Sequence, residues 1–577
     1  MNKSKAINII NASMGREMCD LRISNATVID VYGGGTFKAD IYIKDGRIVG
    51  FDGNREAKEH IDAKGQYAVP GFIDGHCHIE SSHLSPSEFS DAVVPCGTTT
   101  VIADPHEICN VSGLDAMKYM LSSAKDAPLD IFYMFPSCVP ATPFEHSGAI
   151  LNAKEIETLI DNDRILGLGE MMNYVGVINT DEVVMDKLEC AYKRGKNIDG
   201  HVPSIQGQGL DAYIAAGITT DHECESPEEL KEKVRKGMYV LLRQGTACKN
   251  VLQLLPGVDD FNYKRCLFCT DDRQPQSIIR EGHINYGVSL AIKAGLDPIK
   301  AISAASLNAA ECFNLKDRGA IAPGKRADLF LTQSLEDLKP SMVFIEGRKA
   351  AEDGRILIKA PHVKPEGVEG MMNVKDLSLD TFRLELRTDE ARVIKIVPGG
   401  VVTLSTNESI KRDSEGLWVH DKDKDILKIT VIERHHGTGY HASGLIKGYG
   451  MKHGAVGTSI AHDSHNLIII GDNDDDMLSV ARKLVELGGG ITMYKDGKEL
   501  MSHRLEIAGL MTDESLEDVV KCLDDMHDIA ERELEVSKMI DPFMTLCFMA
   551  LPVIPELKIT DCGLFDVTTF SFTDISI

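Results

Sequence analysis

The chain has 577 residues, and its 88 acidic residues outnumber its 62 basic ones, which gives a net charge of −26. This acid excess excludes a nucleic-acid or anionic-membrane surface as the main function, because phosphate backbones and anionic lipids require a basic face. Hydrophobic residues make up 43% of the chain and charged residues 26%, which are values of a folded globular protein. At roughly 100–200 residues per domain, the length predicts two to four domains.

The N-terminal segment and the cysteines predict a cytoplasmic protein. The first twenty residues lack the continuous apolar run of a signal peptide. The most apolar late stretch, residues 543–554, is too short to span a bilayer and contains Pro552. Fourteen cysteines are scattered without a compact framework, as in proteins with reduced thiols. The Cys266–Cys269 pair lies in strand-like sequence, which favours buried thiols over a zinc or redox site.

Residues 1–68 predict the first part of a small β-domain. Residues 22–31 alternate between apolar and polar side chains, and IYIKDGRIVGF reads as a hairpin that turns at Asp45-Gly46.

Residues 69–310 predict a (β/α)8 barrel. Eight short apolar runs alternate with amphipathic, helix-like segments; the runs are YAVPGFID, TTTVIAD, IFYMFPS, RILGLGE, KNIDGH, GITTDHE, MYVLLRQG and CLFCTDD. Eight strand–helix repeats over roughly 250 residues are the pattern of this barrel. The fold class predicted is therefore α/β.

Two further segments follow the barrel. Residues 311–364 return to strand composition with Gly-rich turns, and we expect them to complete the small β-domain. Residues 365–577 predict a separate α+β domain, with strands near 393–397 and 426–433 and helices near 474–487 and 515–534.

Most predicted barrel strands end in side chains that can bind a metal ion. Because the carboxyl ends of barrel strands converge on one face, these side chains should meet there. Residues two apart on a strand share a face, so both histidines of the HCH motif can point inward. The predicted ligands are His76, His78, Glu170, His201, His222 and Asp271. Six ligands are too many for one tetrahedral ion and suit two ions about 3.5–4 Å apart.

These motifs resemble the amidohydrolase superfamily and, more closely, its bacterial adenine deaminase family. The resemblance rests on PGFIDGHCHIESS, GTTTVIADPHEICNV, FCTDDRQP and GAIAPGKRADLFL, and on the C-terminal HHGTGYHASG and AHDSHNLIIIGDNDDDM. It implies a metal-dependent hydrolase of a cyclic amidine C–N bond. The expected reaction converts adenine and water to hypoxanthine and ammonia in purine salvage, through a metal-bridged hydroxide.

The resemblance also implies roles and cofactors. We expect two divalent ions per chain, with Mn(II) first, Fe(II) second and Zn(II) third. Asp271, at the edge of the metal site, is expected to shuttle a proton from the hydroxide to the leaving amine. Glu107 is the first candidate for the acid at N1 of adenine, ahead of Glu80, Asp104, His106 and Glu223. The expected substrate-binding residues are Asp104, His106, Glu80 and Glu223. For Asp104 and Glu107, helix capping or support of the histidines remains an alternative. Adenine is the expected partner, in a homo-oligomer such as a dimer.

Other polar residues are not expected to bind the metal ions or to take part in the chemical step. His83 and His283 are expected on solvated loops, with lining of the barrel mouth as the alternative, and Arg273 is expected in a structural ion pair. Six histidines between 435 and 465 lie in a Gly-rich region. We expect part of HHGTGYHASG to cover the mouth of a barrel, of this chain or of a partner. Packing within its own domain and a second metal site are the alternatives.

Two rival functions remain open. A hydantoinase or dihydroorotase would share the metal chemistry, but those enzymes use a carboxylated Lys where this chain has Glu170. A non-catalytic scaffold would typically lack some ligands, whereas here all six positions are filled.

Overall fold

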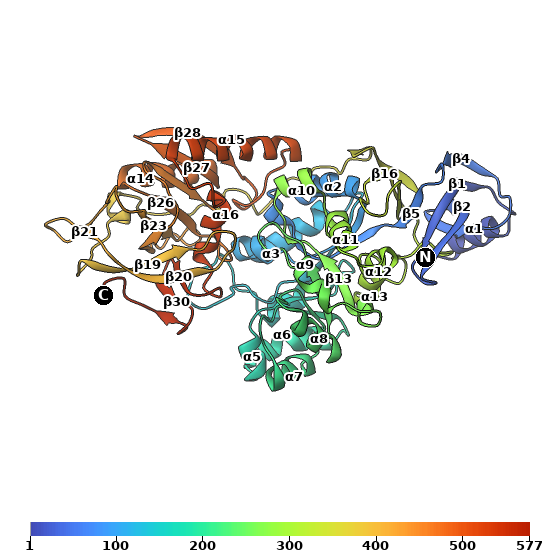
Figure 1. Ribbon diagram of the computed structural model, residues 1–577, viewed down its shortest axis with the longest axis horizontal. Coiled ribbons are helices and arrows are strands. Elements are labelled where there is room, and N and C mark those ends of the chain that lie inside the picture. The colour runs from blue at the N-terminus through green and yellow to red at the C-terminus, as the bar shows by residue number, and fades with distance from the viewer. Residues whose placement is uncertain (1) are drawn as a thin grey trace.

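The computed structural model describes residues 2–577 and shows three units in a row (Figure 1). A β-rich unit that contains the N-terminus lies at one end, a barrel lies in the middle, and the C-terminal unit lies at the other end. This is the α/β architecture that the sequence predicts.

The flanking β-unit is a nine-stranded sheet in the order β18-β17-β16-β15-β5-β1-β2-β3, with β4 paired to β1. Its strands are β1 (Cys19–Asp30), β2 (Gly35–Lys44), β3 (Arg47–Gly50), β4 (Ala57–Asp62), β5 (Tyr67–Pro70), β15 (Leu329–Thr332), β16 (Pro340–Ile345), β17 (Arg348–Glu352) and β18 (Arg355–Ile356). The predicted β2–β3 hairpin is confirmed. Helix α1 (Lys3–Ser13), which packs on this sheet, was not predicted.

The antiparallel pairing of β5 with β15 brings the chain back to the β-unit after the barrel. Pro70 of β5 lies opposite Leu329, so the β-unit extends two residues beyond the predicted boundary at 68. The last barrel helix likewise ends at Cys312 rather than at 310.

The barrel contains the eight predicted strand positions. Its strands are β6 (Phe72–His78), β7 (Thr98–Ala103), β8 (Asp130–Phe135), β9 (Ile165–Met171), β10 (Asn197–Gly200), β11 (Thr220–Asp221), β12 (Tyr239–Arg243) and β13 (Cys266–Cys269), the last followed by β14 (Asp271–Asp272). The strands pair in parallel in two runs, β14-β6-β7-β8-β9-β10 and β11-β12-β13, without a ladder between β10 and β11, both of which the structure describes in full. The β14–β6 pairing brings the eighth strand back to the first. Strands such as β7 are buried along their whole length, as parallel strands covered by helices require.

Helices surround these strands. They are α2 (Pro86–Val93), α3 (His106–Ser123), α4 (Ala153–Leu159), α5 (Tyr174–Ile178), α6 (Glu182–Tyr192), α7 (Gly207–Ala215), α8 (Pro227–Arg235), α9 (Val251–Leu254), α10 (Pro275–Glu281), α11 (Ile284–Lys293), α12 (Pro298–Ala304) and α13 (Leu307–Cys312). Local sequence marks their starts: Ser226 caps α8 by accepting the Glu229 N–H, and Pro227 occupies the first turn.

The C-terminal unit is built on an eight-stranded sheet in the order β20-β19-β24-β23-β26-β25-β27-β28. These strands are β19 (Glu390–Ile396), β20 (Thr403–Ser409), β23 (Ile426–Ile432), β24 (His441–Lys447), β25 (Ala455–Thr458), β26 (Leu467–Gly471), β27 (Gly490–Lys495) and β28 (Lys498–Arg504). The accompanying elements are β21 (Lys411–Arg412), β22 (Trp418–Val419), β29 (Leu557–Thr560), β30 (Gly563–Asp566), β31 (Ser571–Phe572), α14 (Asp474–Leu487), α15 (Leu516–Leu534) and α16 (Pro542–Cys547). The expected strands and both expected helices are confirmed.

The C-terminal unit is docked on the mouth of the barrel. The Thr512 N–H donates to the His83 carbonyl, at 2.9 Å, and Arg280 of α10 pairs with Asp524 of α15 at 2.6 Å. One apolar core runs through both units and includes Ile108, Ile460 and Leu510. The carboxyl ends of the barrel strands therefore face a second unit rather than open solvent.

The Cys266–Cys269 pair forms β13 and is buried, which confirms the core interpretation. In the part of the chain that the structure describes, no helix is both long and apolar enough to cross a bilayer.

Candidate metal centre and adjoining pocket

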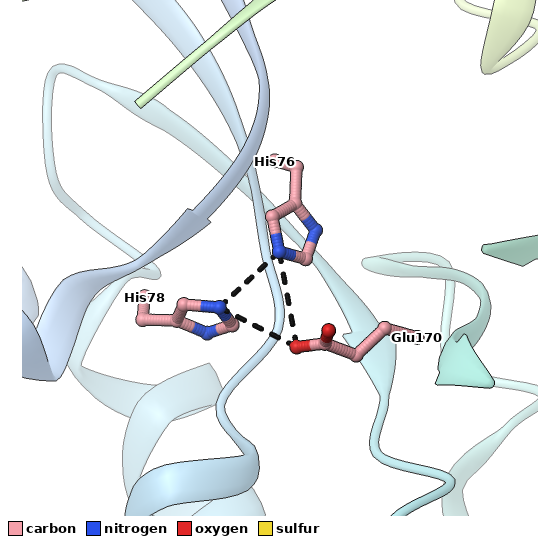
Figure 2. A group of neighbouring side chains, drawn as sticks. All are labelled: His76, His78 and Glu170. Atoms are coloured by element: carbon pink, nitrogen blue, oxygen red, sulfur yellow. Dashed lines mark hydrogen bonds and ion pairs between the residues drawn. The ribbon is translucent and has the colours of Figure 1, made fainter. Parts of the chain in front are cut away.

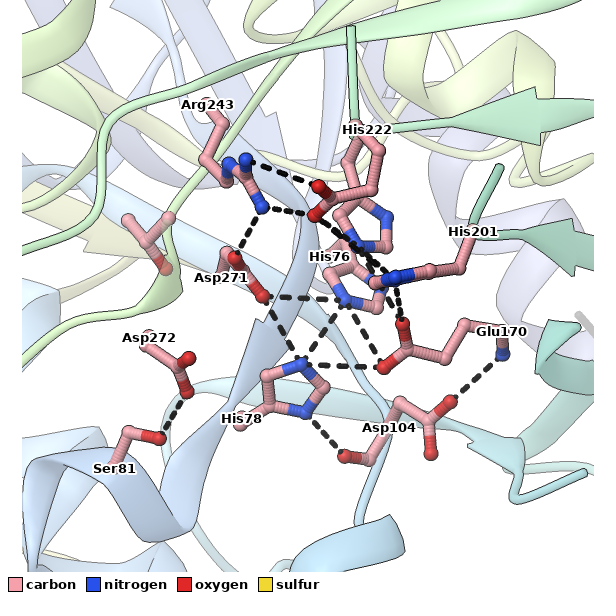
Figure 3. Close-up of polar contacts among 12 residues, drawn as sticks. His76, His78, Ser81, Asp104, Glu170, His201, His222, Arg243, Asp271 and Asp272 are labelled. Atoms are coloured by element: carbon pink, nitrogen blue, oxygen red, sulfur yellow. Dashed lines mark hydrogen bonds and ion pairs between the residues drawn. The ribbon is translucent and has the colours of Figure 1, made fainter. Parts of the chain in front are cut away.

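All six predicted ligands meet at the carboxyl ends of the barrel strands (Figure 3). His76 and His78 lie on β6, Glu170 on β9 and Asp271 on β14, while His201 and His222 directly follow β10 and β11. Five of the side chains are at most 9% exposed, and that of His201 is 21% exposed. The strand ends therefore deliver four imidazoles and two carboxylates to one buried place.

The two β6 histidines and Glu170 form one group (Figure 2). The Nε2 atoms of His76 and His78 are 3.2 Å apart. Glu170 Oε1 lies 3.4 Å from Nε2 of His78 and 3.8 Å from that of His76. Asp271 Oδ1 lies 3.1 Å from His78 Nε2.

The hydrogen bonds of the Nδ1 atoms of His76 and His78, opposite the Nε2 atoms, indicate that this group can bind a cation. His78 Nδ1 lies 2.9 Å from the Asp104 carbonyl, which can only accept, so the proton of the neutral ring is on Nδ1. His76 Nδ1 lies 3.0 Å from the Asp199 carboxylate and donates in the same way. When both rings are neutral, as metal ligands must be, their Nε2 atoms carry lone pairs that face each other and two carboxylates. Lone pairs converging without a proton between them are the donor set of a divalent metal ion.

Glu170 connects this group to a second one. Its Oε2 lies 2.8 Å from His201 Nδ1 and 3.5 Å from His222 Nε2, and these two nitrogens are 3.3 Å apart. One carboxylate oxygen thus faces the β6 histidines and the other faces the second pair. A carboxylate in this position can bridge two ions.

Two residues that support the ligands, Asp199 and Gly169, were not identified from the sequence as doing so, whereas a supporting role was an alternative for Asp104. Asp199 orients His76, as described above. The Asp104 side chain accepts the Glu170 N–H at 2.9 Å. This contact requires Gly169, because a Cβ there would lie 2.2 Å from the Asp104 carboxylate. Only Asp199 offered a signal, two residues before His201 in IDGH.

Arg243 of β12 lies beside Asp271 (Figure 3), and it also donates to Glu223. Its Nη1 donates to Asp271 at 2.9 Å. Burial alone would raise the pKa of Asp271, but the Arg243 charge and the histidines hold it well below its usual range. The same guanidinium lowers the pKa of Glu223 against the effect of burial. Asp271 is therefore ionised and faces the β6 histidines.

A pocket adjoins the six residues, between the barrel and the C-terminal unit. It has about 460 Å³ of empty space, part of it open to solvent. The barrel contributes Glu80, Ser81, His83, Glu107, Asp272 and Gln274, and the C-terminal unit contributes Ile460, His462, His465, Leu510, Met544, Cys547 and Phe548. Its wall is therefore shared between two units.

Glu80 and Glu107, both expected at the substrate site, line this pocket, and their carboxyl groups differ in hydrogen bonding and in pKa. Glu80 Oε1 accepts the Ile108 N–H at 3.1 Å, while the buried Oε2 has no partner. Burial raises the pKa of Glu80 to about 7. Burial would also raise the pKa of Glu107, but neighbouring His462, His465 and His106 hold it well below its usual range.

Other expected residues lie outside the pocket lining. Asp104 faces the Glu170 backbone, which corresponds to the supporting alternative rather than to substrate contact. His106 Nδ1 lies 3.1 Å from Glu170 Oε1, and Glu223 is paired with Arg243.

The expectation of solvated loops for His83 and His283 is wrong. The docked C-terminal unit buries His83, which lines the pocket as the alternative had it. His283 packs against Thr98 and Phe89 inside the barrel. Arg273 is paired with Glu281 at 3.0 Å, as expected.

The expectation that HHGTGYHASG covers the mouth of the barrel is also wrong in part. His436 of HHGTGYHASG bonds the Ser147 carbonyl of a barrel loop, and its neighbour His435 bonds the Ser464 carbonyl within its own unit. The residues of this unit that reach the pocket come from other segments, among them Ile460, His462 and His465. The HxxH spacing in AHDSHN was the available signal.

Comparisons with known proteins match the whole chain. The amidohydrolase family matches residues 67–350, and the adenine deaminase C-terminal domain matches residues 400–571. The chain is 48% identical over 575 residues to adenine deaminase 2 of Desulfotalea psychrophila, covering 100% of both chains. It is 44% identical over 572 residues to adenine deaminase of Ligilactobacillus salivarius, covering 99% of each.

Among solved structures, L-hydantoinase (dihydropyrimidinase) from Arthrobacter aurescens is similar over 59% of this chain and 98% of its own, with 17% identity and a TM-score of 0.45.

Proposed function

The chain belongs to the adenine deaminase family of the amidohydrolases, and on that premise we propose how its own residues carry out the reaction. The reaction is the hydrolytic deamination of adenine to hypoxanthine and ammonia, by a hydrolase that depends on divalent metal ions. The observation that carries the proposal is the convergence of bare histidine lone pairs and two carboxylates beside a pocket for a small molecule.

The proposed cofactor is a pair of divalent ions. His76, His78, Glu170 and Asp271 would hold one ion, and His201, His222 and the other oxygen of Glu170 the second. Imidazole and carboxylate ligands suit Mn(II), Fe(II) and Zn(II) alike, so the proposed order of preference, Mn(II) before Fe(II) before Zn(II), rests on the family resemblance. When bound, such ions lower the pKa of water from 15.7 to about 7 and supply a nucleophile at neutral pH.

Asp271 is the proposed proton shuttle. Its carboxylate is ionised and lies at the edge of the metal group, which suits it to accept a proton from the attacking water. It then delivers that proton to N6, which leaves C6 as ammonia. N1 gains its proton from an acid in the pocket, and the second hydrogen of the water restores the proton on that acid, so the atoms balance.

The proposed acid at N1 is Glu80 rather than Glu107. The Glu80 Oε2 atom is buried, lacks a partner and lines the pocket, so it is available to carry a proton to the base. Glu107 instead receives hydrogen bonds from two histidines, which suits an ionised acceptor for an N–H of adenine.

An ammonia-release assay tests the function. Metal-free protein is reconstituted separately with Mn(II), Fe(II) or Zn(II) and offered adenine, adenosine, guanine or cytosine. We expect release from adenine at about two ions per chain, with the highest rate in Mn(II). Full activity with one ion would overturn the two-ion arrangement, and release from another base alone would overturn the substrate.

We also propose a cytoplasmic homo-oligomer, a dimer being the commonest closed symmetry. Light scattering of the metal-loaded protein measures its mass; a monomeric mass at assay concentration contradicts this part.

A further inference from the structure

The C-terminal unit donates two hydrogen bonds to Glu107 of the barrel. His462 Nδ1 lies 2.6 Å from Glu107 Oε1, and His465 Nε2 bonds the other oxygen, Oε2. The two histidines are 355 and 358 residues away from Glu107 in the sequence. All three side chains are at least nine-tenths buried.

The proton positions indicate that the two histidines bind the Glu107 carboxylate rather than a metal ion. The Ala461 N–H donates to His465 Nδ1, at 3.2 Å, so Nδ1 is unprotonated. The ring proton must then be on Nε2, where it is donated to Glu107. A metal ion would require the lone pair on Nε2 instead.

The segment that contains both histidines is itself held in place. Buried Arg434 donates to the backbone carbonyls of Met371 and Ala508 at 2.9 and 3.0 Å, and also to the carbonyl of His465. The His462 N–H donates to the Cys547 carbonyl at 3.0 Å, and its ring stacks on Phe548 with centroids 4.5 Å apart. The two donors therefore meet Glu107 from a fixed direction.

We propose that His462 and His465 are positioning residues that fix the Glu107 carboxylate in the pocket, so that the barrel and the C-terminal unit share one active site. This rests on the proposed function, in which Glu107 receives an N–H of the bound base. A carboxylate with both oxygens held cannot rotate away from the ring. Misplacement of a positioning group by about 1 Å can cost as much as 10²-fold in rate.

Amide substitutions test the proposal, because Asn places its N–H₂ near the His Nδ1 position and Gln near Nε2. His462 donates through Nδ1 and His465 through Nε2. We therefore expect His462→Asn and His465→Gln to keep most activity, and His462→Gln and His465→Asn to lower kcat/KM roughly 10–100-fold. His453→Gln, at an exposed position of the same unit, is the control.

A double-substitution cycle shows whether the histidines act through Glu107. In the Glu107→Gln background, His465→Asn should add little further loss, because the group that it positions has already been changed. Metal content and the thermal midpoint are measured for every variant. The proposal is overturned if Asn and Gln lower kcat/KM equally at each histidine, or if the loss from His465→Asn adds to that of Glu107→Gln. Either result would assign the histidines a purely structural role.

The wild-type protein separates this test from that of the function. If wild-type protein with two ions releases no ammonia from adenine, the proposed function fails. If it is active and the amide pattern is absent, only the positioning role fails.

Discussion

The metal centre and the Glu107 cluster lie side by side but are built in different ways. The six metal-centre residues all come from the strand ends of one barrel, whereas Glu107 is completed by two histidines of another unit. The first arrangement follows from closing the barrel, because its strand ends must converge. The second requires two units to dock correctly. We infer that the metal chemistry belongs to the barrel, and that recognition of the base depends on both units.

The largest effect should come from removing a metal-centre histidine. His78→Ala should lose bound metal and turnover together, since no other group supplies its Nε2 lone pair. Elemental analysis and the ammonia assay measure both, and a chelator should reproduce the loss in the wild type. An active His78→Ala protein with two ions would remove His78 from the centre.

Asp271→Asn should separate metal binding from proton transfer at the same centre. Asn keeps the size and one oxygen, so four histidines and Glu170 should still retain metal, while turnover falls about 10²–10⁴-fold. The loss should appear in kcat and kcat/KM alike, because the missing interaction belongs to the transition state. Near-normal turnover with both ions present would move the shuttle role to another residue.

Glu80→Gln tests the pocket next to the centre. The amide cannot deliver a proton to N1, so we expect a loss of about 10²-fold in kcat with unchanged metal content. Glu281→Gln, which changes a carboxylate outside the pocket, is the matched control. Unchanged kcat in Glu80→Gln contradicts the acid role.

Asp199→Asn should weaken the centre without touching a ligand. Loss of the carboxylate that orients His76 should lower metal affinity about 10–100-fold. Activity should recover when excess metal is added, which distinguishes this variant from His78→Ala. Unaltered affinity in a competition titration would show that Asp199 does not support His76.

The smallest effect on turnover is expected at the joint between the barrel and the β-unit. Asp130 pairs with Arg326 at 3.0 Å and Arg318 at 2.5 Å. Burial opposes ionisation, yet these arginines and Arg164 lower the pKa of Asp130 to about 2. Because the folded pKa lies below the unfolded value of about 3.9, the stabilisation is complete above about pH 4 and is lost as the pH falls toward 2.

Asp130→Asn should therefore lower the thermal midpoint at pH 7, by an amount equivalent to about 2–3 kcal/mol. Arg318 and Arg326 each lose one carboxylate partner but keep Asp317 and Asp328, respectively. The difference from the wild type should shrink at pH 3, while kcat at pH 7 stays unchanged. A difference that is constant between pH 3 and 7 would contradict the ionised pair.

The sequence by itself determined the eight barrel strands and the six residues that meet at their ends. The strands follow from the local periodicity of the sequence. The six residues meet because they stand at the ends of strands that close into one barrel. The resemblance to adenine deaminases also indicated the C-terminal domain and the chemistry.

Only the tertiary structure decided how the pocket is completed. Arg243 reaches Asp271 across neighbouring strands, and His462 and His465 reach Glu107 over more than 350 residues of chain. The burial of His83 likewise depends on docking. Such contacts follow from side-chain directions and from the packing of two units, neither of which leaves a period or a fixed spacing in the sequence.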